Sequence, residues 1–187
     1  SGDAGDEFYG GYKRYLTARD LWRYSSKVPD FTRSFISGTL KNKLVKDTLV
    51  NYLPDSLLRK YSNPSNRLNK ISRLANLIDQ KDLSSFYSTL MSNVNLNNFL
   101  KYEIQSKKTY IPEGEKNILS ALMKSDIYSY LPNDILTKVD RTSMAHSLEV
   151  RVPLLSKELS EWSFKLPMKY KIKNNKQKIF LKKYLEK

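Results

Sequence analysis

Glycine is distributed unevenly along this 187-residue chain, because four of its six glycines fall within the first eleven residues. They stand beside acidic residues in the opening run Ser-Gly-Asp-Ala-Gly-Asp-Glu. Glycine adopts backbone conformations that other residues avoid, and it lets a backbone approach a ligand closely. The opening run therefore predicts a tightly bent loop beside a ligand, whereas the rest of the chain needs few such turns.

Helical spacing dominates the sequence after Gly11. Apolar residues recur three and four positions apart, most clearly between residues 68 and 78. The apolar pattern and its capping residues predict helices over about 12–28, 30–36, 40–53, 65–78, 83–91, 118–123 and 158–164. We expect Gly38 to end the second helix, Asp82 to cap the helix over 83–91, and Ser156 to cap the last one.

Strand signals are few, and the clearest short candidate is Lys169–Lys173, where lysines alternate with Tyr170 and Ile172. The sequence shows no internal repeat and nothing that marks a second domain. We therefore predict a mainly α chain.

Composition excludes several classes of protein. The chain has no Cys and a single His, His146, so it lacks the residues for a disulfide framework, a thiolate zinc site or a multi-histidine metal centre. It has no apolar run of the ~18 residues that a membrane span needs, and we expect a cytoplasmic protein. Its net charge of +14 favours a polyanionic partner: a phosphate-rich ligand, nucleic acid or a membrane surface.

Three acids, Asp3, Asp6 and Glu7, lie on the glycine-rich opening loop. Hard oxygen ligands beside a closely approaching backbone suit a magnesium ion that also contacts substrate phosphates. The alternative is a solvated acidic turn ahead of a helix, where negative charge is favourable as well. The spacing alone leaves both interpretations open.

The second segment that carries chemistry is 130–154. It sets charged residues among small and apolar ones: Lys138, Asp140, Arg141, Glu149 and Arg151. We expect that these charges do not all face water, and that Arg151 forms a structural ion pair with Glu149 or Asp140. Lys138 and Arg141 either bind an anionic substrate or have a structural role, and the sequence leaves this open. The same segment contains the lone histidine, which we expect to be packed in a helix.

These two segments resemble motifs of one family. The opening is similar to the Ser-Gly-Asp-Gly-Gly-Asp-Glu-Leu-Phe-Gly-Gly-Tyr motif of the glutamine-hydrolysing asparagine synthetases. Residues 130–155 resemble that family's Leu-Pro-Asp-Asp-Leu-Leu-x-Lys-Val-Asp-Arg-x-Ser-Met-Ala-His-Ser-Leu-Glu-Val-Arg-Val-Pro-Phe-Leu-Asp signature, nearly without gaps. Residues 13–129 match only in their helical, basic character.

The resemblance implies the helical C-terminal portion of an α/β ATP-pyrophosphatase synthetase domain, similar to the adenine nucleotide α-hydrolases. Residues 1–187 would be a partial asparagine synthetase domain, with a nucleotide-loop segment at 1–12 and a helical region at 13–187. In that family, ATP with Mg²⁺ adenylates the side-chain carboxylate of aspartate, and ammonia from a separate glutaminase domain then displaces AMP. A homodimer is a further expectation.

Site residues follow from the matching motif positions. The resemblance assigns catalytic roles to Asp3 and Asp6, with Asp6 near magnesium and pyrophosphate and Asp3 near the aspartate or ammonia. It assigns binding of ATP or substrate to the remaining positions: Gly2, Gly5, Glu7, Lys138, Asp140 and Arg141.

Three departures from the family pattern stand out. Ala4 replaces a glycine, which would cost roughly 1 kcal/mol at a positive φ. Ser156 replaces an aspartate, and both residues can cap a helix. The family's pyrophosphate-binding Ser-Gly-Gly-x-Asp-Ser loop, its Arg-x-Lys-x-Gly-Phe segment and its glutaminase domain are absent from the 187 residues. We therefore expect a piece of a longer parent, with little or no ATP hydrolysis by the piece alone.

Other interpretations remain. The carboxylate substrate could belong to another pathway, because β-lactam synthetases, peptide cyclases and proteins of surface-polysaccharide synthesis share this signature. The chain could also be a catalytically inactive scaffold. A non-catalytic, basic helical module that binds nucleic acid is disfavoured, because lysine and arginine are spread along the whole chain and no nucleic-acid motif is present.

Overall fold

The computed structural model describes residues 1–42, 45, 72–92, 109–112 and 114–186. These residues are mainly helical, as the sequence predicts. The chain forms two compact units: unit 1 comprises Ser1–Asp20 and Thr109–Lys187, and unit 2 comprises Leu21–Lys108. In the described part of the chain, no helix is long and apolar enough to cross a membrane.

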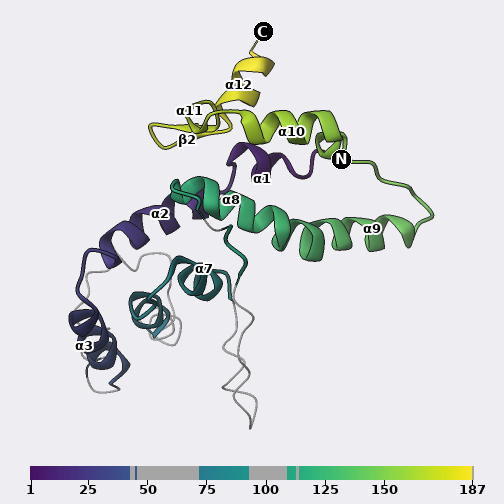
Figure 1. Ribbon diagram of the computed structural model, residues 1–187. Helices are drawn as coiled ribbons and strands as arrows, with labels where there is room; N and C mark the ends of the chain where they lie inside the picture. The colour runs from purple at the N-terminus through teal and green to yellow at the C-terminus, as the bar shows by residue number, and fades with distance from the viewer. Residues whose placement is uncertain (43–44, 46–71, 93–108, 113, 187) are drawn as a thin grey trace. The chain divides into compact units, whose positions relative to one another are not determined.

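Unit 1 contains the two segments that carry the sequence motifs. Its elements in chain order are α1 (Gly5–Tyr9), the start of α2 (Lys13–Ser25), α8 (Ile118–Tyr128), η2 (Leu131–Leu136), α9 (Thr137–Met144), η3 (Pro153–Leu155), α10 (Lys157–Lys165), α11 (Met168–Lys171), β1 (Ile172–Lys173), β2 (Lys176–Gln177) and α12 (Ile179–Leu185). The segment η2 is a π-helix, and Figure 1 shows α8, η2 and α9 as one continuous run.

The short helix α1 lies at the core of unit 1 and contacts α8, α10 and α12. Its residues Phe8 and Tyr9 are buried together with Ala4 and Leu131. Phe8 meets Phe164 of α10 edge-on, with 5.6 Å between ring centroids. This packing means that the acidic opening segment is a structural centre of the unit and is more than a surface turn.

A β-hairpin covers one end of α1. Its strands pair Ile172 with Gln177 and Lys173 with Lys176, and Asn174 and Asn175 form the turn at φ 50° and 58°. Asparagine tolerates this left-handed conformation, which two-residue hairpin turns require. The predicted strand over 169–173 is therefore wrong in its first part, because Met168–Lys171 is helical and the strand begins at Ile172.

Unit 2 contains the rest of α2, α3 (Asp30–Lys41), a helix over 72–78 and α7 (Leu83–Met91). The predicted cap of α7 is confirmed, since the Ser85 N–H donates to the Asp82 carboxylate at 2.8 Å. The prediction that Gly38 ends a helix is wrong, because α3 continues through it to Lys41. A single glycine costs a helix only about 1 kcal/mol, which the rest of the helix can offset.

Other sequence predictions fall on residues outside the described ranges. They are the helix over 40–53, apart from its first residues, and the start of the helix at 65.

Gly10 provides a test of how the hairpin and α1 fit together. Its φ is 69°, and a Cβ there would lie 2.6 Å from Cδ1 of Ile172. Gly114 has a similar φ of 77° with nothing within 4 Å of such a Cβ. We expect Gly114→Ala to cost about 1 kcal/mol of unfolding free energy, for backbone strain alone. Gly10→Ala should cost about 1–3 kcal/mol more, because it also overpacks the site.

Urea denaturation measures both costs. Adding Ile172→Val to Gly10→Ala removes the Cδ1 methyl and should restore part of the loss. Equal costs at the two glycines would contradict the contact between Gly10 and the hairpin.

Burial of Lys171 makes the stability of unit 1 depend on pH in the alkaline range. The side chain is 6% exposed, and burial, with the nearby charge of Lys124 adding to it, lowers the pKa of its ammonium from 10.5 to about 8. Between these two values the folded chain binds fewer protons than the unfolded chain, so its stability rises with pH. We expect Lys171→Met to be more stable than the wild type below pH 8, with the difference shrinking towards pH 10.5.

Chemical denaturation at a series of pH values checks this, with the exposed Lys173→Met as the matched control. A constant difference between wild type and Lys171→Met across this range would contradict the burial of a charged ammonium.

Candidate functional site

The two catalytic acids of the sequence analysis lie at the start of α1. Asp6 is in the first turn, and its Oδ1 forms an ion pair of 2.9 Å with Nζ of Lys178, with each side chain about one third exposed. Asp3 is half-buried and accepts a hydrogen bond from the Ser1 hydroxyl. The accessible opposite charges of Asp6 and Lys178 mark this part of the surface as a place where a metal–phosphate ligand could bind.

Lys178, the ion-pair partner of Asp6, is a residue that the sequence analysis did not single out. It lies between the hairpin, which ends at Gln177, and α12. Its φ is 54°, a left-handed conformation. Because 172 positions separate it from Asp6, no local pattern links the two residues. The only local signal was its position in a lysine-rich stretch, which looked like general positive charge.

Glycines around Asp6 serve different purposes. A Cβ on Gly11 would overlap Oδ1 of Asp6 and Cε of Lys178, so only glycine leaves room for the ion pair. Gly5 is buried, and a Cβ there would lie 3.2 Å from Leu154 in η3. Gly2 is exposed, with nothing near a Cβ. The nucleotide-approach roles of Gly2 and Gly5 stay predictions, and packing is an added constraint at Gly5.

Ala4 adopts the conformation that makes its family position a glycine. Its φ is 68° immediately before α1. This conformation costs an L-residue roughly 1–2 kcal/mol. The methyl group, however, is 1% exposed in the core, and burying one such carbon returns about 0.8 kcal/mol. Burial of the methyl group therefore offsets part of the strain, and α1 still forms with Ala4 at its start.

Glu7 is buried, unlike the other two acids of the opening loop. It is 1% exposed, and the Tyr12 hydroxyl donates to its Oε1 at 2.8 Å. Burial raises the pKa of the Glu7 carboxyl, while the bond from Tyr12 partly lowers it. The three acids of the opening loop thus do not converge, and among the described residues no three Asp, Glu, His or Cys side chains are grouped for a metal ion. The binding role of Glu7 stays a prediction.

A magnesium ion does not require such a group. Mg²⁺ is commonly held by one or two carboxylates together with substrate phosphates and water. Asp6, which is about one third exposed, paired with a lysine and followed by the turn at Gly10 and Gly11, fits a metal–phosphate complex that brings its own oxygen ligands.

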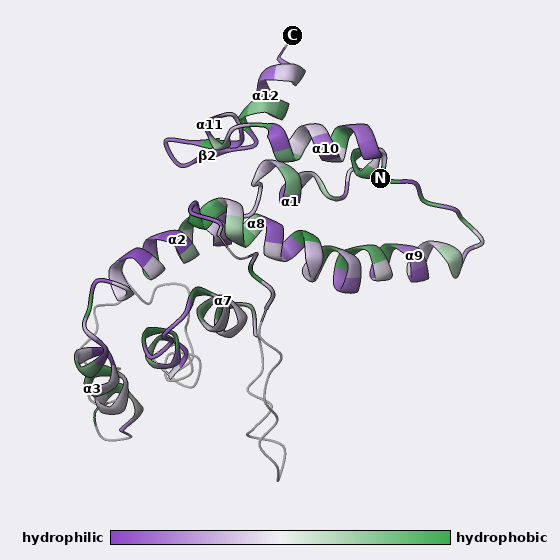
Figure 2. Ribbon diagram, in the orientation of Figure 1, coloured by the Kyte–Doolittle hydropathy of each residue, from purple (hydrophilic) through white to green (hydrophobic). Residues whose placement is uncertain are grey.

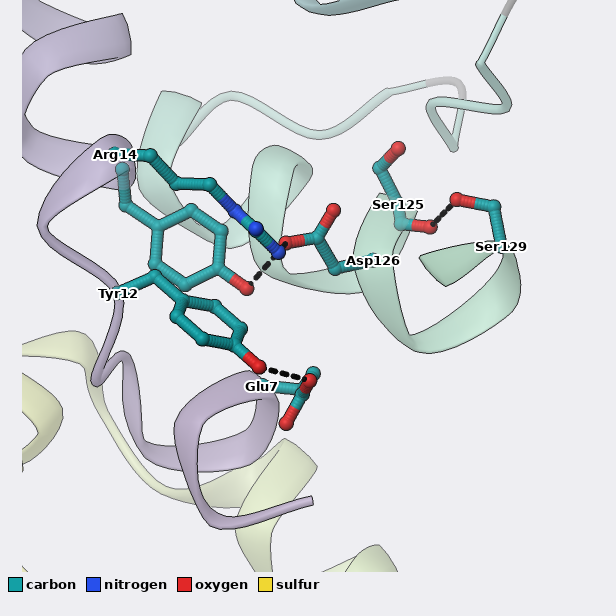
Figure 3. Close-up of polar contacts among 7 residues, drawn as sticks. Glu7, Tyr12, Arg14, Ser125, Asp126 and Ser129 are labelled. Atoms are coloured by element: carbon teal, nitrogen blue, oxygen red, sulfur yellow. Dashed lines mark hydrogen bonds and ion pairs between the residues drawn. The ribbon is translucent and has the colours of Figure 1, made fainter. Parts of the chain in front are cut away.

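An aromatic and ionic network lies next to Glu7, and Figure 3 labels three of its residues: Tyr12, Arg14 and Asp126. Asp126 of α8 is 1% exposed and accepts from Nη2 of Arg14 and from the Tyr15 hydroxyl, each at 2.7 Å. The guanidinium carbon of Arg14 lies 3.9 Å from the ring centroid of Tyr12 and 4.3 Å from that of Tyr130. We call these five residues the Arg14 network. The sequence analysis did not identify this network, because its residues come from two segments, 12–15 and 126–130, that lie more than a hundred positions apart.

The charged residues of α9 are exposed. Lys138, Asp140 and Arg141 all face solvent, and α9 has no buried residue. Figure 2 shows hydrophobic and hydrophilic residues mixed along this helix. Within the described ranges, no side-chain hydrogen bond or ion pair joins these three residues to α1 or to each other. The expectation that the charges of this segment are not all solvent-facing is wrong for the described chain, because α9 projects beyond its neighbours.

Two other expectations for this segment have mixed outcomes. Arg151 does pair with Glu149 at 2.9 Å, but the side chains are 85% and 73% exposed, so the pair adds little stability. His146 lies in the turn after α9 and is exposed, so the prediction of a packed helical histidine is wrong. Downstream, Ser156 caps α10 as predicted, accepting from the Leu159 N–H at 3.4 Å.

Residues 1–187 match the sequence profile of the family described as asparagine synthase. The chain belongs to the asparagine synthase family. Its mainly helical structure is consistent with part of the synthetase domain.

Two curated relatives come from Bacillus subtilis (strain 168). The chain is 28% identical over 191 residues to glutamine-hydrolyzing asparagine synthetase 1, an alignment that covers 100% of this chain and 27% of that protein. It is 35% identical over 89 residues to glutamine-hydrolyzing asparagine synthetase 3, covering 46% of this chain and 14% of that protein. The chain therefore spans about a quarter of the length of the first relative. No solved structure matches the chain.

Burial of Glu7 predicts a change of stability with acidic pH. In the folded chain the pKa of Glu7 lies above the ordinary value of 4.5. At pH values between 4.5 and this raised pKa, the folded chain therefore binds more protons than the unfolded chain. Stability therefore falls as pH rises from 4.5 through the raised pKa. Glu7→Gln keeps an acceptor for Tyr12 and does not titrate. We expect the unfolding free energy of Glu7→Gln relative to wild type to increase with pH above 4.5 and to level off once the pH exceeds the raised pKa of Glu7.

Denaturation between pH 4 and pH 7.5 measures this difference, with Glu158→Gln on the exposed side of α10 as the control. A pH-independent difference for Glu7→Gln would show that Glu7 is not titrating in a buried environment.

Proposed function

We propose that this chain forms part of the synthetase site of an ATP-dependent asparagine synthetase. The observation that carries the proposal is the match of all 187 residues to the asparagine synthase family. The ion pair of Asp6 and Lys178 supports it, because Asp6 lies in the opening motif that the family resemblance assigns to the nucleotide and Lys178 brings a positive charge to it.

The reaction has two steps. A side-chain carboxylate oxygen of aspartate attacks the α-phosphorus of ATP, the bond to the bridging oxygen breaks, and pyrophosphate leaves. The nitrogen of ammonia then attacks the acyl carbon of the adenylate, AMP leaves with the bonding electrons, and nitrogen loses a proton to give asparagine. In the proposed protein the ammonia comes from glutamine hydrolysed in another domain.

Each residue of the site has a role suited to its charge. Asp6 would supply a carboxylate oxygen to the Mg²⁺ that accompanies ATP, and this metal spreads the negative charge of the leaving pyrophosphate. Lys178, released from Asp6, would offer its ammonium to phosphate oxygens. Asp3 would lie towards the aspartate or ammonia, and the backbone at Gly2 and Gly5 would approach the nucleotide.

The charges of α9 complete the proposal. Lys138 and Arg141 are exposed, and their positive charge is available to an anionic substrate. Asp140 lies between them and would shape the same pocket. Stabilisation of phosphate charge by such fixed cations is a main source of rate enhancement in phosphate chemistry.

Substitution of Asp6 tests the proposal in the complete polypeptide that contains this chain. We expect aspartate-dependent pyrophosphate release in the wild type, and we expect Asp6→Asn to lower kcat/KM for ATP by about 10²–10³-fold. Lys178→Met should show a loss of the same kind. Glu158→Gln, an exposed acid on α10, serves as the control and should retain wild-type activity.

Two outcomes would contradict the proposal. If Asp6→Asn kept wild-type activity, Asp6 would have no role with the metal. If aspartate gave no pyrophosphate release but another carboxylic acid did, the family chemistry would hold and aspartate would be the wrong substrate.

A further inference from the structure

Arg14 occupies the centre of the Arg14 network, and its contacts run in three directions. Its guanidinium binds the buried carboxylate of Asp126 at 2.7 Å. It also lies over the rings of Tyr12 and Tyr130, whose centroids are 6.1 Å apart with the ring planes at 81°. Arg14 thereby joins α2, the turn after α1, and the start of η2.

The shape of the guanidinium matters for this arrangement. Arginine presents a flat, delocalised cation that stacks on aromatic faces while it donates to a carboxylate, whereas lysine is a compact point charge. A lysine at position 14 would keep positive charge beside the Asp126 carboxylate, which also accepts a hydrogen bond from the Tyr15 hydroxyl. It would lose the flat contact with both rings.

One arm of the network leads to the acidic segment. The hydroxyl of Tyr12 donates to Glu7, and Glu7 follows Asp6 directly in the first turn of α1. Glu7 is held in the core by this bond, so the position of the Tyr12 ring affects the position of that turn. The guanidinium of Arg14 lies over that ring, 3.9 Å from its centroid.

The other arm leads to α9. Tyr130 immediately precedes the π-helix η2, which continues without interruption into α9. The orientation of η2 therefore sets the direction of α9, and with it the positions of Lys138 and Arg141. Within the described residues, no side-chain hydrogen bond or ion pair connects these cations directly to α1. The contacts of Arg14 with both tyrosines provide an indirect link.

We propose that Arg14 is a positioning residue that fixes the acidic segment and α9 relative to each other. The proposal rests on the proposed function, in which Asp6 and the α9 cations act on the same phosphate-bearing substrate. Arg14 itself would touch no reacting atom. It acts through Tyr12 on the turn of Asp6, and through Tyr130 on the helix of Lys138 and Arg141.

Arg14→Lys is the informative variant, because it keeps charge for Asp126 and changes only the contact with the rings. Arg19→Lys is the matched control: Arg19 lies five positions further along α2 and forms an ion pair of 2.8 Å with Asp20. Both are made in the complete polypeptide. The first measurement is kcat and KM for ATP at a temperature where circular dichroism shows wild type and variants equally folded.

The second measurement is amide hydrogen exchange without substrate. It compares residues 5–12 and 131–144 with residues 157–165 of α10, which include none of the ring or carboxylate partners of Arg14 and serve as an internal reference. This measurement needs no activity, so it tests the positioning role even if the proposed function fails.

We expect Arg14→Lys to lower kcat about tenfold or more, because small misplacement of reacting groups is costly. Exchange should become faster in both 5–12 and 131–144 while α10 is unchanged, and Arg19→Lys should change neither quantity. Wild-type kcat in fully folded Arg14→Lys, or faster exchange in only one of the two segments, would overturn the positioning role. An inactive wild type would instead overturn the proposed function and leave the exchange result to decide the role of Arg14.

Discussion

Asp126 lies in the last turn of α8 with almost no exposed surface, and the arrangement of unit 1 depends on how its charge is held. A buried carboxylate that loses its partner destabilises a protein by about 3–5 kcal/mol. Arg14 and Tyr15, both at the start of α2, each contact the Asp126 carboxylate, so Asp126 would lose both of these contacts if α2 moved away from α8. The acidic segment 1–12 precedes α2 and is placed by the same contacts.

Backbone conformation then shapes the acidic segment itself. Ala4 and Gly10 both adopt left-handed conformations, one before and one after α1, so the helix is limited to five residues. This short helix sends Glu7 into the interior and leaves Asp6 accessible, although the two residues are adjacent. Gly11 then gives the Asp6 side chain the space to meet Lys178. Local sequence thus separates two neighbouring acids into a buried one and an accessible one.

Sequence reasoning succeeded where the cause is local. Asp82 and Ser156 cap helices because each supplies an acceptor to an N–H three residues on, and Ala4 has the positive φ that its family position suggests. It failed where the cause is tertiary. The contact of Lys178 with Asp6 and that of Arg14 with Asp126 join residues more than a hundred positions apart. The exposure of α9 also depends on what surrounds the helix, which its own residues do not encode.

The π-helix η2 has a consequence for how insertions and deletions are tolerated. In an α-helix each residue turns the chain by roughly 100°. A π-helical segment contains wider turns than the α-helices on either side of it, and such segments often occur near functional positions. Deleting one residue within Leu131–Leu136 would convert the run towards a plain α-helix and rotate all of α9 about its axis. The length of this six-residue segment, beyond its composition, therefore sets the direction in which the charges of α9 project.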